Sequence, residues 1–493
     1  SGTGRTTTVT NFNYDGGFSS QGGIRLNNFD GTFTASNSRL TNGALTSNGV
    51  NIVGDTDVTI NFQSTVNFDS LDGTAFNVDG DVGGTDSIGG TITVASAINN
   101  DTNRSVSVRN LATGASVSFN GNITDTGTGV LVADNTAGNV TFVGDLAMTI
   151  DTAAATAVAV TGNAAATNID FAGDVNITAT DTANGFVATG GGTISAPGTV
   201  NTISVASGQA LKITDMNIAS ASVRFGDINR TVAAASSAIQ LENNTSTGSG
   251  SIVVGNTTDN VGDAGTIEAG NGNAILVKDT ANASITGLIV NKTGTGAGVR
   301  VEKTSTATQT TNLSDLRVSG GEEGINTVGG GTGGLTMTVN DTTVQNQTSI
   351  GMHFNNVDVT TTPIQVNNTT VDGDPTIAAA RGVVVEGSNG SITFNNAVQI
   401  KEWGSTDFEV SGITTTPTPG TISFAGDIIN SSAANAQDTT GRSVHIHNNA
   451  AGTVTFTSES SIDDRNQGML VAQNTGGTFT FSGDNNFNTG TND

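Results

Sequence analysis

The sequence of 493 residues contains no cysteine, which excludes disulfide bridges, thiolate metal sites and cysteine nucleophiles. It also lacks any run of eighteen apolar residues, so we expect no membrane-spanning helix. Only five prolines occur, and all of them lie between short β-prone runs, where they remove no hydrogen bond from a sheet. No charged and apolar leader begins at Ser1, so we expect any signal peptide to have been removed or to lie outside this segment.

Basic residues are scarce as well: 17 Lys and Arg stand against 43 Asp and Glu, which gives a net charge of −26. Such a charge repels phosphate backbones and anionic lipid, whereas it attracts divalent cations. We therefore expect no nucleic-acid partner and no membrane insertion. The single tryptophan and single tyrosine offer little aromatic surface for stacking on sugars.

What the sequence does contain is a repeat of short β-prone runs separated by Gly, Asn, Asp and Thr. The stretch from Gly114 to Asn135 holds two such runs, and the stretch from Gly138 to Asn163 repeats it. The first half-motif is aliphatic-x-Phe or aliphatic-x-aliphatic, often followed by Gly-Asp or Gly-Asn, as in residues 119–123, 171–175, 225–228, 424–428 and 481–484. The second is a small residue before aliphatic-x-aliphatic, commonly ending in Asn, as in residues 23–27, 106–110, 239–243, 444–448 and 468–474.

Equivalent phenylalanines give the repeat length. Phe119, Phe142 and Phe171 are 23 and 29 residues apart, and later spacings of 30, 32 and 25 separate Phe394, Phe424, Phe456 and Phe481. A period of 23–32 residues predicts an all-β parallel β-helix, or β-solenoid, with two or three strands per turn. Glycine and asparagine would fill corners that need positive φ, and most phenylalanines would point inward.

We predict one continuous domain over residues 1–493 with roughly 17–18 turns, which at about 4.8 Å per turn makes a rod near 80–90 Å long. The first β-run, Thr7–Thr10, and the last, Thr478–Phe481, look like ordinary turns and not like caps. Uncovered strand edges at both ends predict a segment of a longer chain, or a subunit that assembles end to end.

Three phrases carry a family resemblance: residues 185–195 (GFVATGGGTIS), 208–213 (GQALKI) and 420–424 (GTISF). They resemble the repeats of very large secreted bacterial right-handed parallel β-helix proteins, of the kind found in planctomycetes. The resemblance covers nearly the whole chain and rests on composition and period. It implies a right-handed β-helix at the cell surface or outside the cell, and it implies no activity and no functional residues.

The most repetitive acidic feature is an aspartate after glycine in the first half-motif. Its members are Asp145, Asp174, Asp227, Asp427 and Asp484, with Asn122 at the same position. If they stack about 4.8 Å apart at one corner, their carboxylates repel unless a cation bridges them or turn N–H groups bind them. Bonding to the local backbone is the favoured interpretation. Calcium is the alternative, and it is the one cofactor that the sequence suggests.

The three histidines form a second candidate. In Val444–His447 the aliphatic residues point inward, so His445 and His447 share the outward face, and His353 occupies the matching position of its own turn. Two imidazoles on one strand can bind a metal, but a site needs a third or fourth ligand. Solvent-facing strand residues are the favoured interpretation.

The other charged residues give weaker indications of a functional site. Asp463-Asp464-Arg465 is the only run of two aspartates and a basic residue, and it is interpreted as a solvated turn, with no Gly-His-Gly setting nearby. Glu322-Glu323 is expected in a surface turn, and the arginines of interest are expected in loops without partners: Arg230, Arg381 and Arg442.

These observations favour a structural extracellular protein and not an enzyme: a rigid β-helical element of a bacterial surface fibre, layer or adhesin that associates with itself or with other surface proteins. The alternative is a carbohydrate-active β-helix, either a polysaccharide lyase or glycosidase or a tailspike-like glycan binder. That alternative predicts a groove where at least two carboxylates and an aromatic side chain converge.

Overall fold

The computed structural model describes residues 5–15, 23–43, 48–54, 56–71, 73–80, 87–255, 258, 260–358, 362–415, 419–430, 441–464 and 468–487. These residues form an all-β fold of about 16 turns in which three parallel sheets stack as a β-solenoid. In this part of the chain no helix is long and apolar enough to cross a membrane. The predicted fold class is confirmed.

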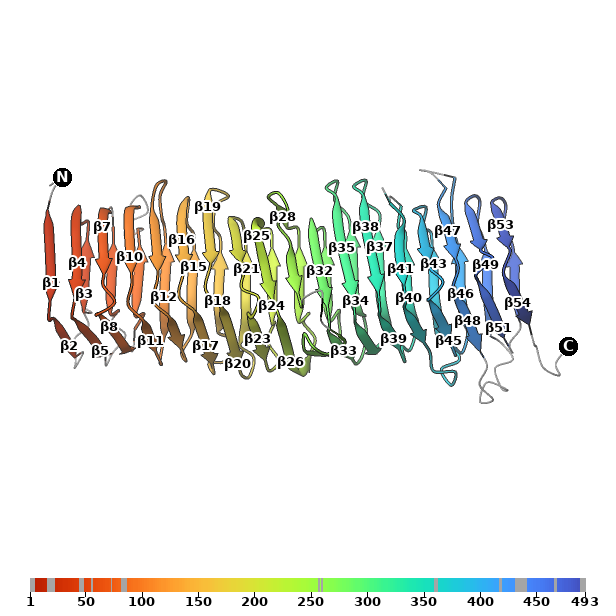
Figure 1. The fold of residues 1–493 in the computed structure, drawn as a ribbon, viewed down its shortest axis with the longest axis horizontal. Helices are drawn as coiled ribbons and strands as arrows, with labels where there is room; N and C mark the ends of the chain where they lie inside the picture. Colours follow the sequence, from red (N-terminus) through yellow and green to blue (C-terminus); the bar gives the residue numbers. More distant parts are fainter. Residues whose placement is uncertain are drawn as a thin grey trace. The chain divides into compact units, whose positions relative to one another are not determined.

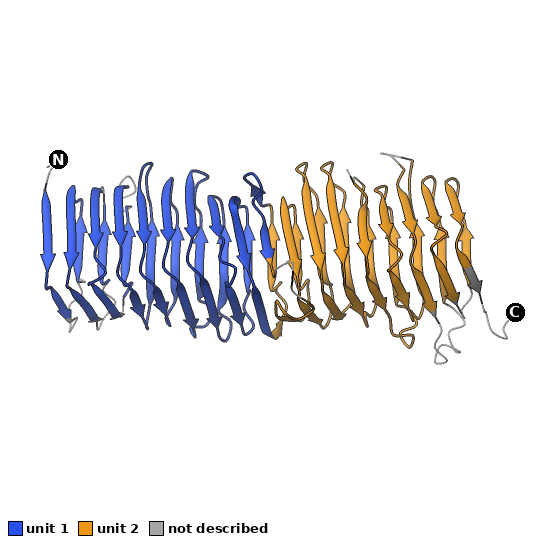
Figure 2. Cartoon of the chain, in the orientation of Figure 1, with its two compact units in different colours: residues 1–231, 244–253 blue, residues 232–243, 254–493 orange. Residues whose placement is uncertain are grey.

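The chain divides into two compact units, drawn in different colours in Figure 2. Unit 1 comprises residues 1–231 and 244–253, and unit 2 comprises residues 232–243 and 254–493. In each unit a turn passes through a strand of sheet A, then one of sheet B, then one of sheet C, before the next turn repeats the path (Figure 1). The single continuous domain over residues 1–493 stays a prediction.

The strands of unit 1 are short, and those of each sheet pair in parallel. Sheet A contains β1 (Thr6–Thr10), β4 (Gly31–Ser36), β7 (Thr56–Phe62), β10 (Ile88–Val94), β13 (Ser116–Phe119), β16 (Gly138–Phe142), β19 (Thr167–Phe171), β22 (Thr193–Ala196), β25 (Asn217–Phe225) and β28 (Thr245–Ser246). Sheet B contains β2 (Asn13–Asp15), β5 (Arg39–Gly43), β8 (Asn67–Leu71), β11 (Ile98–Asn100), β14 (Ile123–Asp125), β17 (Leu146–Ile150), β20 (Val175–Ala179) and β23 (Thr202–Val205). Sheet C contains β3 (Ile24–Asn27), β6 (Val50–Val53), β9 (Phe76–Asp79), β12 (Arg104–Arg109), β15 (Gly129–Ala133), β18 (Thr156–Thr161), β21 (Asn184–Thr189) and β24 (Leu211–Thr214).

Unit 2 repeats this plan. Sheet A contains β32 (Asn282–Thr286), β35 (Gln309–Ser314), β38 (Leu335–Asn340), β41 (Ile364–Asn367), β44 (Ile392–Phe394), β47 (Thr421–Phe424), β50 (Thr453–Phe456) and β53 (Thr478–Phe481). Sheet B contains β30 (Thr266–Ala269), β33 (Ile289–Lys292), β36 (Arg317–Gly320), β39 (Thr343–Gln345), β42 (Thr370–Asp372), β45 (Gln399–Lys401), β48 (Asp427–Asn430), β51 (Ser461–Asp464) and β54 (Asp484–Phe487). Sheet C contains β27 (Ile239–Glu242), β31 (Ile275–Lys278), β34 (Ala297–Lys303), β37 (Glu323–Gly329), β40 (Ile350–Asn355), β43 (Arg381–Glu386), β46 (Thr406–Ser411), β49 (Arg442–His447) and β52 (Met469–Ala472). Two further strands, β26 (Asp227–Ala234) and β29 (Ile252–Val254), contain residues of both units.

The register confirms the period predicted from phenylalanine spacing. Phe119 pairs with Phe142, and Phe142 pairs with Phe171, on neighbouring strands of sheet A. In unit 2 the same holds along the series Phe394, Phe424, Phe456 and Phe481. Two turns of unit 2 are longer than predicted, because Ile239 pairs with Ile275 and Phe408 with Val444, each 36 residues apart. Longer turns account for a turn number slightly below the predicted 17–18.

Each unit has the same kind of interior. The rings of Phe119 and Phe142 stack at 5.2 Å between centroids in unit 1, and those of Phe456 and Phe481 at 4.9 Å in unit 2. Buried asparagines line one corner: Asn135 N–H donates to Asn163 Oδ1 at 3.2 Å in unit 1. Such stacks satisfy the polar groups of the corner while the aliphatic and aromatic residues exclude water.

The corners explain the abundance of Gly and Asn. Where sheet C strands end, residues take positive φ, as Asn110 (57°) and Asn448 (57°) do, and asparagine tolerates this conformation better than other residues. Glycine at the start of a sheet C strand has a packing reason: a Cβ at Gly382, the second residue of β43, would lie 2.4 Å from the Asp407 carbonyl oxygen of the next turn. The half-motif of a small residue before aliphatic-x-aliphatic therefore corresponds to sheet C.

Candidate metal centre

Two neighbouring strands of sheet C in unit 2 bring three metal-binding side chains together. In β49 the side chains of Val444 and Ile446 are buried in the interior, so His445 and His447 project from the outer face. In β46, Glu409 occupies the same outer face, and it pairs directly with His445 across the two turns. One ligand atom each from Glu409, His445 and His447 lies within 4.8 Å of the others, the only such group of three among the described residues.

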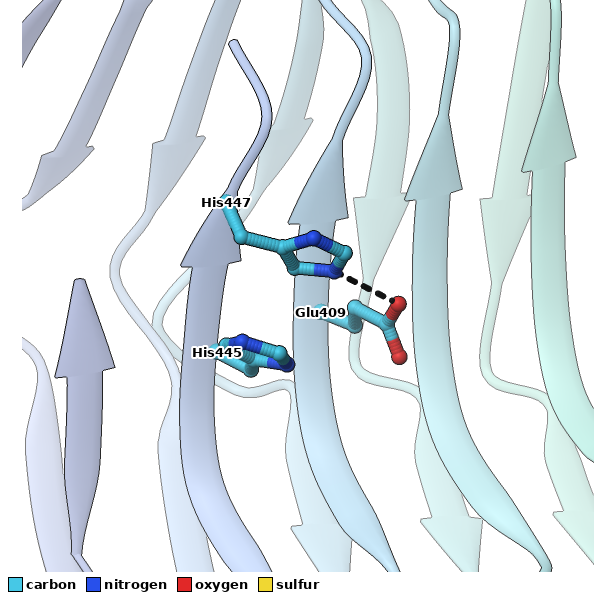
Figure 3. Close-up of side chains that lie close together, drawn as sticks. All are labelled: Glu409, His445 and His447. Atoms are coloured by element: carbon cyan, nitrogen blue, oxygen red, sulfur yellow. Dashed lines mark hydrogen bonds and ion pairs between the residues drawn. The ribbon is translucent and has the colours of Figure 1, made fainter. Parts of the chain in front are cut away.

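Both imidazoles extend from β49 toward the carboxylate of Glu409, as Figure 3 shows. His447 Nε2 lies 3.1 Å from Glu409 Oε1. The two imidazole rings stack with centroids 4.0 Å apart and an interplanar angle of 20°. The three donors therefore face one small volume without rearrangement of the backbone.

Neighbouring side chains hold the donors in place. Arg381 Nη1, from β43, lies 3.1 Å from Glu409 Oε2, which leaves Oε1 for the histidines. The Asn448 side-chain amide donates to His447 Nδ1 at 2.9 Å. The Glu409 side chain is 11 % exposed and that of His447 19 %, so the group is partly shielded from water but reachable.

The surroundings of Glu409 and His445 shift their pKa values toward the forms that bind metal. Burial alone would raise the pKa of Glu409, but the hydrogen bond from His447 and the charge of Arg381 hold that pKa below its ordinary value. Burial lowers the pKa of His445, and the charges of His447 and Arg442 act in the same direction against Glu409. At neutral pH the carboxylate is therefore ionised and the His445 ring is neutral.

His353 forms a separate cluster on the same face. His353 occupies the outward position that matches His445, as the sequence predicted, and the row between them runs through Val384 and Glu409. Its Nδ1 lies 3.0 Å from Glu323 Oε1, and its Nε2 lies 3.4 Å from Glu386 Oε2. His353 is 7 % exposed, so the expectation of a solvent-facing histidine was wrong here: the carboxylates of the neighbouring turns cover it.

The five predicted aspartates are only partly brought together. Asn122, Asp145 and Asp174 lie on consecutive turns, where the Asp145 N–H donates to Asn122 Oδ1 and the Asp174 N–H donates to Asp145 Oδ1, both at 3.0 Å. Asp227 lies two turns after Asp174, and Ser461 lies between Asp427 and Asp484. Calcium at any of these aspartates stays a prediction.

Three groups of charged residues lie elsewhere than expected. Asp463 and Asp464 belong to strand β51 and not to a turn, whereas Arg465 lies outside the described residues. Glu323 begins strand β37, where its carboxylate contacts His353. The arginines expected in loops lie in strands: Arg230 in β26, Arg381 in β43 and Arg442 in β49. Arg230 is fully buried, and burial lowers its pKa to about 10.

Sequence reasoning identified the outward histidine pair but missed Glu409. Glu409 lies in an aliphatic-x-aliphatic run, Phe408 to Val410, which marks it as outward facing. The pairing of Glu409 with His445 could not be predicted, because the turn from Phe408 to Val444 is 36 residues long and exceeds the predicted period of 23–32 residues.

A comparison of the chain with protein-family models, with curated proteins and with solved structures found no match.

Proposed function

We propose that the chain is a structural protein, a β-solenoid element of a bacterial cell-surface fibre, layer or adhesin. The observation that carries the proposal is the repetition of one turn plan throughout both units, with parallel pairing, aromatic stacks and buried asparagines in register. Hydrogen bonds between neighbouring turns stabilise each turn against the next, which suits a scaffold built of repeated units. The resemblance to secreted bacterial β-helix repeats supports a place outside the cell.

The proposal includes self-association through strand edges. In the last described turn, Val471 is 42 % exposed, and Phe479 and Phe481 are partly exposed, whereas Ile446 and Phe456 one turn earlier are fully buried. A further strand would bury these side chains and pair with the free backbone groups, whether it comes from a second copy or from further chain.

Electron microscopy and sedimentation of the purified chain test the proposal, each with calcium and with a calcium-selective chelator. We expect concentration-dependent assemblies that Val471→Glu weakens. The matched control is Val143→Glu, because Val143 is 49 % exposed at a corner of unit 1, away from any strand edge. Loss of the assemblies on chelation would support calcium at the contacts.

Single dispersed chains at all concentrations would contradict self-association. Depolymerisation of a glycan by the same preparation would favour the carbohydrate-active alternative instead.

A further inference from the structure

The outer face of unit 2 carries a donor set that a structural role does not require. Glu409, His445 and His447 lie on the outer face of β46 and β49, whereas Phe408, Val410, Val444 and Ile446 of the same strands form the buried interior. We propose that these three side chains bind one Zn²⁺ ion per chain, which cross-links two neighbouring turns of sheet C. The inference does not depend on the proposed surface role.

The chemistry of the donors selects the metal. Two imidazoles and one carboxylate are a ligand set that zinc takes in sites with an open fourth position, whereas calcium requires six to eight oxygen ligands. The Glu409 side chain is 11 % exposed and that of His447 19 %, so the group leaves room for water as the fourth ligand. The net charge of −26 raises the local concentration of divalent cations near the chain.

Geometry supplies the second argument. The donors come from β46 and β49, which are held in register by backbone pairing of Phe408 with Val444 and of Val410 with Ile446. The ligand atoms already lie within 4.8 Å of one another, so metal binding breaks only the hydrogen bond between His447 Nε2 and Glu409 Oε1. Little conformational entropy is lost when such a preformed group binds a metal.

The surroundings match what a bound histidine needs. Binding through His447 Nε2 requires the single proton of the neutral ring to move from Nε2 to Nδ1, which must then donate a hydrogen bond. Asn448 lies 2.9 Å from Nδ1, and a 180° flip of its amide presents the oxygen instead of the NH₂ group. Arg381 keeps Glu409 oriented through the oxygen that the metal does not use.

Calorimetric titration of the metal-stripped chain with Zn²⁺ tests the proposal, together with the visible absorption spectrum of the Co²⁺ form. We expect one Zn²⁺ per chain and a Co²⁺ spectrum of four- or five-coordinate intensity. His445→Ala and His447→Ala each weaken Zn²⁺ binding at least tenfold, and Glu409→Gln weakens it about tenfold and changes the Co²⁺ spectrum. Far-ultraviolet circular dichroism checks that each variant keeps its β-structure.

His353→Gln is the matched control, because His353 lies in the same outward row but outside the group, and it leaves the affinity unchanged. The proposal is overturned if no Zn²⁺ binds up to about 1 mM. It is also overturned if either alanine variant binds as the natural chain does, or if Glu409→Gln has no effect, since a histidine pair alone would then explain the binding.

Discussion

The outer faces of sheet C in the two units differ although their interiors are alike. In unit 1 the outward row through β15, β18 and β21 consists of Leu131, Ala159 and Val187. In unit 2 the outward row through β40, β43 and β46 consists of His353, Val384 and Glu409, and His445 follows in β49. The same fold therefore tolerates an apolar or small outer face and a charged one.

The ion pairs of unit 2 follow this difference. They connect neighbouring turns on the outer face, as Lys278 does with Glu242 at 3.1 Å and Arg381 with Glu409 at 3.1 Å. Among the described residues, unit 1 has one such ion pair, between the exposed side chains of Arg109 and Asp134, so ion pairs between turns are concentrated in unit 2. The outer face of sheet C is therefore where the two units differ.

The largest effect tests the claim that the two interiors are equivalent. Phe142→Ala in unit 1 and Phe424→Ala in unit 2 remove a buried ring from a stack of phenylalanines. Each lowers the free energy of unfolding by about 3–5 kcal/mol, because each leaves a cavity that its neighbours cannot fill. Urea unfolding measures both. A loss several kcal/mol larger in one unit would break the comparison.

The second test uses two aspartates at equivalent positions, each directly after a strand of sheet C. Both have positive φ: Asp134 (55°) in unit 1 and Asp279 (44°) in unit 2. Asp279 pairs with Lys303 at 3.2 Å with side chains 4 % and 2 % exposed, whereas Asp134 and its partner Arg109 are 50 % and 42 % exposed. Asp279→Asn therefore costs about 3 kcal/mol, since it leaves Lys303 buried without its counter-charge.

Asp134→Asn is the control, and we expect a change below about 1 kcal/mol, because the Arg109–Asp134 pair is exposed to water. Asparagine keeps the positive φ at both positions. Hydrogen exchange measured by mass spectrometry assigns each loss to its unit. Equal losses would contradict the assignment of the buried ion pair to unit 2.

Zinc gives the third test. At a free concentration a hundred times its dissociation constant, Zn²⁺ adds about 2.7 kcal/mol to the stability of the state that holds the site. Hydrogen exchange of β46 and β49 slows, while β15 and β18 of unit 1 exchange as before. Protection that appears equally in unit 1 would show that zinc acts through general association of chains.

Acid gives the smallest effect, and it has opposite signs in the two units. In unit 2, burial favours the neutral form of Glu323, but hydrogen bonds from His353 and Asn326 outweigh it and lower the pKa, as happens for Glu409. Stability from a lowered carboxyl pKa is present above the ordinary value of 4.5 and is lost as the pH falls through the lower, folded value.

In unit 1, burial raises the pKa of Asp125, which hydrogen bonds from Ser105, Gly129 and Gly127 only partly offset. Its contribution is fully present below the ordinary value of 3.8 and is lost as the pH rises through the folded value. As the pH falls below about 4.5, we expect β40 and β46 to lose protection against hydrogen exchange before β12 and β15 do. The exchange rates are corrected for their intrinsic pH dependence. Simultaneous loss would contradict the difference.

Much of the fold could be predicted from the sequence, because every turn repeats the same local chemistry. The spacing of Phe119, Phe142 and Phe171 corresponds to pairs in sheet A, and the Gly-aliphatic half-motif corresponds to sheet C. Alternation along a strand also placed His445 and His447 on the outer face. These signals are local or have a regular period.

The partners across turns could not be predicted, because they depend on loop lengths that vary from turn to turn. Glu409 meets His445 only because a 36-residue turn brings their strands into register. The prediction that the arginines lie in loops was wrong for a related reason. Arg381 follows a turn-rich segment in the sequence, yet it belongs to β43, and its side chain contacts Glu409 on the neighbouring strand.

The most direct test of a specialised outer face in unit 2 is an anomalous difference map at the zinc absorption edge, from crystals of the chain grown with Zn²⁺. We expect one strong peak between Glu409, His445 and His447, about 2.0–2.2 Å from the ligand atoms. Ordered side chains at these three positions with no peak between them, and zinc bound at other residues, would contradict it.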